Sequence, residues 1–123
     1  MTNPTQSKPT RAALEGLAER VGQATEGTPM LENEIAHMML ASGWHAADCM
    51  RQFTRSIDAA MTLVPENWFF GAEIQQNSYP NKPHDWSVWL ERNDPIDSVA
   101  VLARALPLAL CAAALRARAS SPC

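Results

Sequence analysis

Apolar side chains recur at helical spacing through the first third of the chain. This pattern predicts a helix over residues 10–24, with Thr10 as its N-cap. Its apolar positions are Ala13, Leu14, Leu17, Ala18 and Val21. A second helix is expected after Pro29 and ends at Ser42-Gly43, because glycine is the common residue just beyond a helix C-terminus.

Two further helices follow from the same spacing. Thr54 or Ser56 caps the first of them, and Pro65 stops it, because the residue before a proline is pushed out of the helical region. Its expected apolar face is Ile57, Ala60, Met61 and Val64. The chain closes with a helical segment within 103–119, in which Pro107 suits the first turn. Its apolar stripe is Leu108, Cys111, Ala112 and Leu115.

Between these helices the apolar period changes to two, which is typical of strands. Segments 67–76 and 84–92 alternate and are joined by a turn-rich connector, so they predict an antiparallel hairpin, and 96–102 supplies a third strand. One sheet face is expected to be core and carries Trp68, Phe70, Ala72, Ile74, Trp86, Val88 and Leu90. Phe69 and Trp89 fall on the other face. If a helix covers that face they are core, and if nothing covers it they form an exposed patch that needs a partner.

The predicted fold is therefore α+β, with a small antiparallel sheet of about three strands packed with three to four helices in an α/β sandwich. The composition agrees with a globular chain, since 46% of the 123 residues are hydrophobic and 19% are charged. A net charge of −3 predicts that no nucleic-acid polymer is a partner. No apolar run is long enough for a membrane span, and the polar first ten residues lack a signal sequence, so we expect a cytoplasmic protein.

Three blocks of the sequence resemble one family of small phage-encoded proteins. Met30 to Trp44 is similar to the family's helix that ends in Leu-Gly-Trp, and Phe53 to Trp68 is similar to its block ending in Leu-Val-Pro-Glu-Gly-Trp. Pro107 to Ala117 resembles its C-terminal alanine-rich helix. The family is that of the phage ABA-sandwich-like proteins, found in phages and prophages and known mainly as proteins of unknown function.

The resemblance implies an α/β sandwich and an origin in a phage or prophage of a bacterial host. It divides the chain into a disordered tail (1–9), an N-terminal helical extension (10–28), the sandwich domain (29–119) and a short tail (120–123). Two departures stand out. Phe53 replaces the family's usual tyrosine, and Asn67 replaces glycine, which is mild because asparagine also tolerates positive φ.

Metal binding and nucleophilic catalysis are the first chemistries to weigh. The candidate metal ligands show no standard zinc spacing, and we expect neither a metal nor a cofactor; they are His37, His45, Asp48, Cys49 and His84. Cys49 with His45 as base and Asp48 as orienting group is a conceivable nucleophile. No glycine-rich oxyanion loop accompanies it, so we predict that the protein is not an enzyme.

A small-anion site is the stronger candidate. Arg51 and Arg55 bracket the entry to the third helix, where Thr54, Ser56 and free backbone N–H groups offer further donors for a phosphate. The alternative is two solvated arginines beside a capped helix. Phe69 and Trp89 add a surface for a second subunit or for a stacked planar base.

Together these features suggest a phage accessory protein that acts by binding. The first hypothesis is a counter-defence sponge, a homo-oligomer that sequesters a small host nucleotide-derived immune signal. The alternative is an inhibitor or adaptor that binds a host or phage protein through the aromatic sheet face. A small hydrolase using His45, Asp48 or Cys49 is the third.

Overall fold

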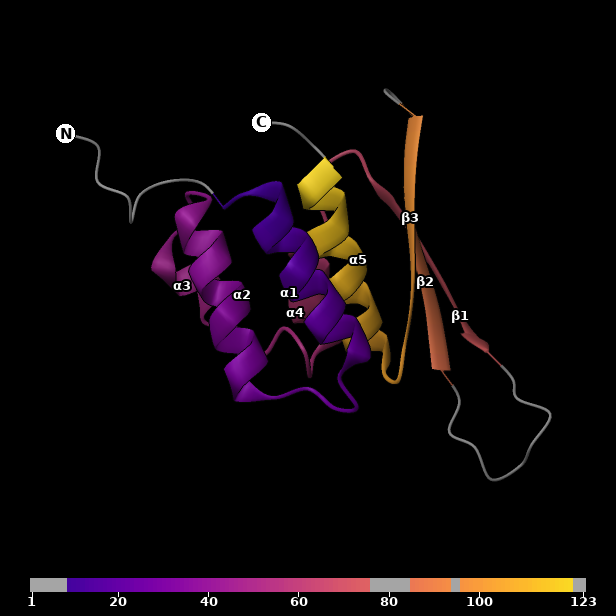
Figure 1. Ribbon diagram of the computed structural model, residues 1–123, viewed down its shortest axis with the longest axis horizontal. Helices are drawn as coiled ribbons and strands as arrows, with labels where there is room; N and C mark the ends of the chain where they lie inside the picture. Colours follow the sequence, from indigo (N-terminus) through magenta and orange to yellow (C-terminus); the bar gives the residue numbers. More distant parts are fainter. Residues whose placement is uncertain (1–8, 76–84, 94–95, 121–123) are drawn as a thin grey trace.

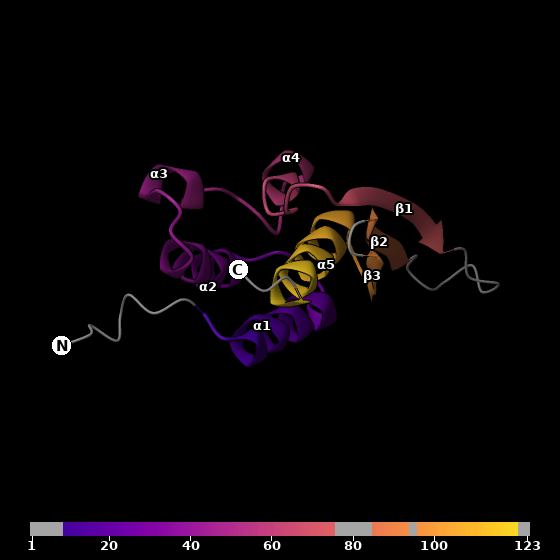
Figure 2. The same ribbon diagram turned by 90° about the horizontal axis from the view of Figure 1, so that it is seen from above.

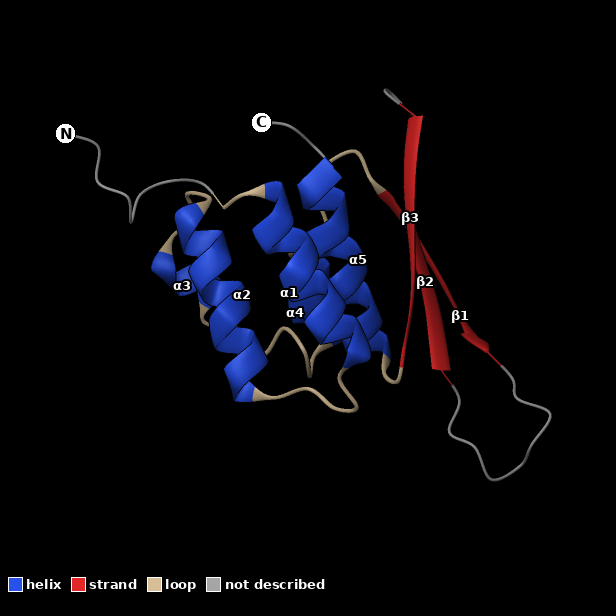
Figure 3. Ribbon diagram, in the orientation of Figure 1, coloured by secondary structure: helices blue, strands red, loops and turns tan. Residues whose placement is uncertain are grey.

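Five helices and a three-stranded sheet form the structure, a computed structural model that describes residues 9–75, 85–93 and 96–120. Figures 1 and 3 show their arrangement. The helices are α1 (Arg11–Gln23), α2 (Pro29–Ala41), α3 (Ala46–Cys49), α4 (Ile57–Met61) and α5 (Leu106–Ser120). The strands are β1 (Phe69–Gln75), β2 (Asp85–Asn93) and β3 (Ile96–Ala103). The predicted α+β class is confirmed.

Local sequence signals explain where the two long N-terminal helices begin and end. The Thr10 hydroxyl accepts a hydrogen bond of 3.0 Å from the backbone N–H of Ala13, as expected of an N-cap. At the end of α2, Gly43 has φ of +101°, and the next N–H, of Trp44, donates to the carbonyl of Met39 at 3.0 Å. This geometry closes α2 with a left-handed glycine and turns Trp44 back onto the helix.

The short helix α4 differs from its prediction. Ser56 caps it, by accepting a hydrogen bond from the N–H of Ala59, whereas Thr54 makes other contacts. The predicted apolar face is wrong in part, because Ile57 and Met61 are 45% and 39% exposed. The residues of this segment that are buried are Ala59, Ala60 and Leu63. The helix is one turn long, so the turn after it, rather than a continued helical stripe, decides which side chains enter the core.

The sheet has the order β1-β2-β3, and both pairs are antiparallel. Phe70 pairs with Leu90 and Ala72 with Val88, and Val88 in turn pairs with Val101, so the predicted hairpin and third strand are confirmed. All five helices lie on the same side of this sheet (Figures 1 and 2). The other side, which carries Trp89, has no helix over it among the described residues.

Helix α5 is the centre of the core. It packs against α1 and α4 on one side and against β2 and β3 on the other. Consequently every residue from 108 to 115 is buried, not only the predicted stripe. Alanine fills many of these positions, which lets the neighbouring elements approach closely. α1 shares this core, since Leu17 and Val21 are fully buried, and the division of the chain at residue 28 stays a prediction.

Strand β1 extends beyond the helical layer. Val88 and Leu90 on β2 are fully buried, as predicted, but Phe70 and Ile74 on β1 are 41% and 48% exposed, although they point to the same sheet face. The prediction that Phe70 and Ile74 belong to the core is therefore wrong. The physical reason is position: α5 lies over β2 and β3, whereas β1 forms the edge of the sheet.

Candidate functional site

A buried carboxylate organises the segment predicted to bind an anion. Glu32 of α2 is only 6% exposed. Its Oε2 accepts hydrogen bonds from the Thr54 hydroxyl at 2.9 Å, the Thr54 N–H at 3.2 Å and Arg55 Nε at 3.0 Å. Its Oε1 accepts a fourth bond from the second nitrogen of Arg55 at 2.7 Å. This Glu32 cluster (Glu32, Thr54 and Arg55) ties the loop before α4 to α2.

The environment of Glu32 favours its charged form. Burial raises the pKa of the carboxyl, but the hydrogen bonds from Arg55 and Thr54 and the positive charge of Arg55 outweigh burial, so the pKa lies below its usual value. Two of the four predicted anion ligands thus already hold an anion, the protein's own Glu32. A bidentate arginine–carboxylate pair of this kind is among the stronger polar contacts in proteins.

The other two predicted ligands lie elsewhere in the local network. The Ser56 hydroxyl is used as the cap of α4. Arg51 follows α3, and its guanidinium donates to the carbonyl of Asp48 at 3.2 Å and lies 3.5 Å from the Asp48 carboxylate. The structure therefore joins Thr54 to Arg55 through Glu32 and leaves Arg51, which is exposed, in a separate pair.

Arg51 also lines a shallow cavity of about 350 Å³, the Arg51 cavity. The other lining residues are Gly43, Trp44, His45, Asp48 and Thr62. Contacts of Arg118 stabilise the position of Trp44 in the cavity wall. The guanidinium of Arg118 lies 5.1 Å from the centre of the Trp44 ring and donates to the Leu63 carbonyl at 2.7 Å. An aromatic ring, a guanidinium and an imidazole thus border one hollow of the surface.

The environment of Cys49, the candidate nucleophile, favours the neutral thiol. Cys49 is buried, and burial raises its pKa, to which the negative charge of Asp48 adds. A catalytic thiolate needs the opposite, a positive or hydrogen-bonding environment that lowers the pKa. Among the described residues, no group of three or more His, Cys, Asp or Glu is placed to hold a metal ion, and the candidate His84 lies outside them.

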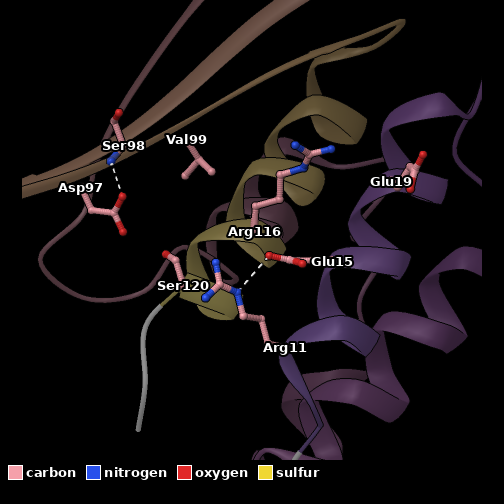
Figure 4. Close-up of a pocket in the computed structure, with 8 residues that line it drawn as sticks. All are labelled: Arg11, Glu15, Glu19, Asp97, Ser98, Val99, Arg116 and Ser120. Carbon is pink, nitrogen blue, oxygen red and sulfur yellow. Dashed lines mark hydrogen bonds and ion pairs between the residues drawn. The ribbon is translucent and has the colours of Figure 1, made fainter.

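A second cavity, of about 460 Å³, lies between α1, α5 and the start of β3 (Figure 4). Three carboxylates and two guanidinium groups border it; the lining residues are Arg11, Glu15, Glu19, Asp97, Ser98, Val99, Arg116 and Ser120. Arg11 pairs with Glu15 at 3.1 Å, and Asp97 accepts a hydrogen bond from the Ser98 N–H at 2.8 Å. The mixture of charges gives this cavity no preference for a ligand of one sign.

The outer face of the sheet is built around Trp89. Trp89 pairs with Gly71 across the β1–β2 ladder, and a Cβ placed on Gly71 would lie 2.3–2.4 Å from three atoms of the indole ring. Glycine is thus required by close approach: the indole lies over the Gly71 backbone and turns its other side outward. Trp89 is half-buried in this position.

Three other large apolar side chains are exposed on the same face as Trp89. Phe69 is 62% exposed, Leu102 58% and Ile96 89%. We call Phe69, Trp89, Ile96 and Leu102 the outer sheet patch. The register places Glu73 and Glu91 on the same face, and Asp85 at its border lies 3.6 Å from Arg104. The patch is therefore apolar with acidic neighbours.

The two groups of predicted site residues do not form one site. Arg51 lies two residues beyond the end of α3, and α3 and the sheet lie at opposite ends of the molecule in both views (Figures 1 and 2). Phe69 and Trp89 belong to the sheet. Sequence reasoning also did not identify Glu32 as a site residue. The available signal was its place three residues into a helix otherwise apolar on that side.

No family model matches the chain, and neither the curated proteins nor the solved structures include a match to it. The resemblance to the phage ABA-sandwich-like proteins accordingly stays a prediction. Within the described ranges, no helix combines the length and the apolar character required to span a bilayer.

Proposed function

We propose that the protein acts by binding another protein through the outer sheet patch. The observation that carries this proposal is the exposure of Phe69, Leu102 and Ile96 on the sheet face of Trp89, which no described helix covers. Exposed apolar clusters of this kind mark contact surfaces, and aromatic side chains are enriched among the residues that dominate binding energies.

The charges beside the patch indicate the chemistry of the partner. Glu73 and Glu91 lie on the patch side of the sheet. A partner surface with basic residues around an apolar centre complements them, whereas an anionic ligand stacked on Trp89 would meet negative charge. Complementary charge at the rim steers association and makes its rate depend on salt.

The biological setting in this proposal comes from the family resemblance. A small phage or prophage protein in the bacterial cytoplasm that binds rather than catalyses would inhibit or redirect a host or phage protein. The first step of this proposal, binding at the patch, does not depend on that setting.

Affinity capture with the full chain tests the proposal. Tagged wild-type protein is incubated with lysate of the source bacterium, in parallel with Trp89→Ala, Glu91→Lys and the control Met30→Ser, which changes an exposed residue on α2. We expect one protein to be retained by the wild type and by the control, and lost with both patch variants. Equal retention by all four contradicts the proposal.

A second candidate function rests on the Arg51 cavity. The indole of Trp44, the guanidinium of Arg51 and the imidazole of His45 border one cavity, and such groups bind small nucleotides, which keeps the sponge hypothesis as a proposal. Calorimetric titration with cyclic nucleotides and ADP-ribose tests it. We expect heat from one of them with the wild type, loss of that heat with Arg51→Ala, and no loss with Arg11→Ala, which removes another helix-paired arginine. No heat from any of them overturns this candidate.

A further inference from the structure

The free edge of β1 combines three features that point to one occupant. Within the described chain β1 is hydrogen-bonded to β2 alone, so its other edge presents unpaired backbone groups. Phe70 and Ile74 are exposed on its helix-side face, and Phe69 is exposed on its outer face. We propose that a second copy of this chain pairs with β1, antiparallel, edge to edge. The proposal goes beyond the contact assigned to the outer sheet patch and stands independently of it.

The sequence of β1 is self-complementary in one register. Phe70, Ala72 and Ile74 share the helix-side face in the order large, small, large. A two-fold axis at Ala72 places Phe70 of each copy opposite Ile74 of the other and the two Ala72 side chains opposite each other. Residues directly opposite in an antiparallel pair have their Cβ atoms about 4.5–5.5 Å apart, close enough for apolar contact. All four exposed side chains are then paired with one another.

Neighbouring registers are worse for definite reasons. An axis at Glu73 sets two carboxylates directly opposite each other, which is destabilising. An axis at Gly71 pairs Phe70 with Ala72 and Ile74 with Trp68, which the chain already buries. A shift by one residue places Phe70 opposite an outer-face residue and puts the two helical layers on opposite sides of the sheet, so the pair is no longer related by a two-fold axis. With the axis at Ala72, Glu73 faces Gly71 of the other copy instead.

The area available agrees with a specific but weak dimer. Two paired seven-residue strands with Phe70 and Ile74 on their helix-side faces would bury on the order of 1,000 Å² in total, near the lower limit of specific interfaces. We therefore expect dissociation in the micromolar range, and a dimer with the outer sheet patches of both copies on the same side of one continuous sheet.

Sedimentation equilibrium of the full chain between 5 and about 500 μM tests the dimer. We expect a monomer–dimer equilibrium that Ile74→Lys weakens at least tenfold, because two ammonium groups are then placed at the seam. The matched control is Leu40→Lys, which changes a similarly exposed aliphatic residue on α2, away from the sheet, and leaves the equilibrium unchanged. A monomer at all concentrations, or equal weakening by both variants, overturns the proposal.

Disulfide trapping tests the register. In a Cys123→Ser background, Ala72→Cys places two thiols opposite each other at a separation that a disulfide spans. Cys49 and Cys111 are buried and do not compete. We expect a covalent dimer on mild oxidation of Ala72→Cys and none for the control Ser98→Cys, an exposed position on β3. Cross-linking of Ser98→Cys but not of Ala72→Cys contradicts pairing at β1.

Discussion

The Glu32 cluster and the outer sheet patch reverse the usual placement of polar and apolar residues. Glu32, a charged residue, is 6% exposed, with both carboxylate oxygens hydrogen-bonded. Phe69, an aromatic residue, is 62% exposed on a sheet face without a helix. The cluster is satisfied within one chain, whereas the patch leaves apolar surface in water.

This contrast separates polar residues that hold the fold together from apolar residues that we propose bind a partner. Arginine, threonine and serine beside a helix start are the residues expected of an anion site, but here Thr54 and Arg55 hold the loop before α4 against α2. Aromatic residues in a strand are normally core, but here several of them remain available to a partner. Mutations in the two regions should therefore affect different measurements: stability for the cluster and association for the patch.

The largest expected loss of stability comes from a substitution at Gly27, whose backbone packs against Thr54 of the Glu32 cluster. A Cβ on Gly27 would lie 2.2 Å from the carbonyl oxygen of Thr54, and backbone cannot move aside as a flexible side chain can. We expect Gly27→Ala to lower the free energy of unfolding by about 3 kcal/mol in a urea titration. Gly16→Ala is the control: nothing lies within 4 Å, and in an exposed helix position it should raise stability by up to about 1 kcal/mol. Equal effects would mean that the loop does not pack on Gly27.

Removal of the buried charge should cost somewhat less. We expect Glu32→Gln to lower the free energy of unfolding by about 2 kcal/mol at pH 7, because Arg55 loses its charged partner. Glu34→Gln, on the same helix as Glu32 but in a partly exposed pair with Arg20 of α1, should change it by less than about 0.5 kcal/mol.

The same variant has a defined pH dependence. The pKa of Glu32 is lower in the folded than in the unfolded state, so its stabilisation is fully present above the unfolded value of about 4.3 and is lost as the pH falls through the folded value. The difference between wild type and Glu32→Gln should shrink when urea titrations are repeated below about pH 4. A difference that stays constant from pH 7 to pH 3 would contradict the assigned role of the charge.

A smaller effect is expected at the entry to β1. Asn67 has φ of +71°, a left-handed conformation that asparagine tolerates better than other non-glycine residues. We expect Asn67→Ala to lower the free energy of unfolding by about 1 kcal/mol, and Asn67→Gly to recover most of this loss. If alanine and glycine behave alike in thermal unfolding, conformation at this residue does not limit stability.

The smallest effect on stability is expected in the outer sheet patch. Leu102→Ser should change the free energy of unfolding by less than about 0.5 kcal/mol, because this exposed side chain gains little on folding. Leu90→Ala, at a fully buried position on the middle strand, should cost about 3 kcal/mol by the same measurement. A large loss with Leu102→Ser would show that the patch belongs to the fold rather than to an interface.

Much of the fold is readable from local signals. Thr10 and Gly43 mark helix boundaries, Asn67 has the positive φ that asparagine tolerates, and the two-residue period marks the strands. Which strands α5 covers is harder to predict from the sequence. Periodicity shows that Phe70 and Leu90 share a face, but not that α5 covers the strand of Leu90 and leaves the strand of Phe70 at the edge. The one-turn length of α4 likewise depends on tertiary packing.

The candidate site was predictable only in its parts. Arg51, Arg55, Thr54 and Ser56 were identified as polar residues at a helix entry, but their actual partners come from distant sequence. Glu32 and Thr54 are 22 residues apart, and no local pattern in a single sequence reports such a pair. The pairing of Trp89 with Gly71 was similarly invisible until the register was known.

The central claim that the free edge of β1 is a contact surface is tested most directly by diluting the full chain. ¹H–¹⁵N correlation spectra are recorded as the concentration falls from about 500 to 20 μM. The account predicts concentration-dependent amide shifts concentrated in β1, with residues 69–75 changing most and the Glu32 cluster constant. Shifts confined to β3, to the region around Glu32 or absent throughout would contradict it.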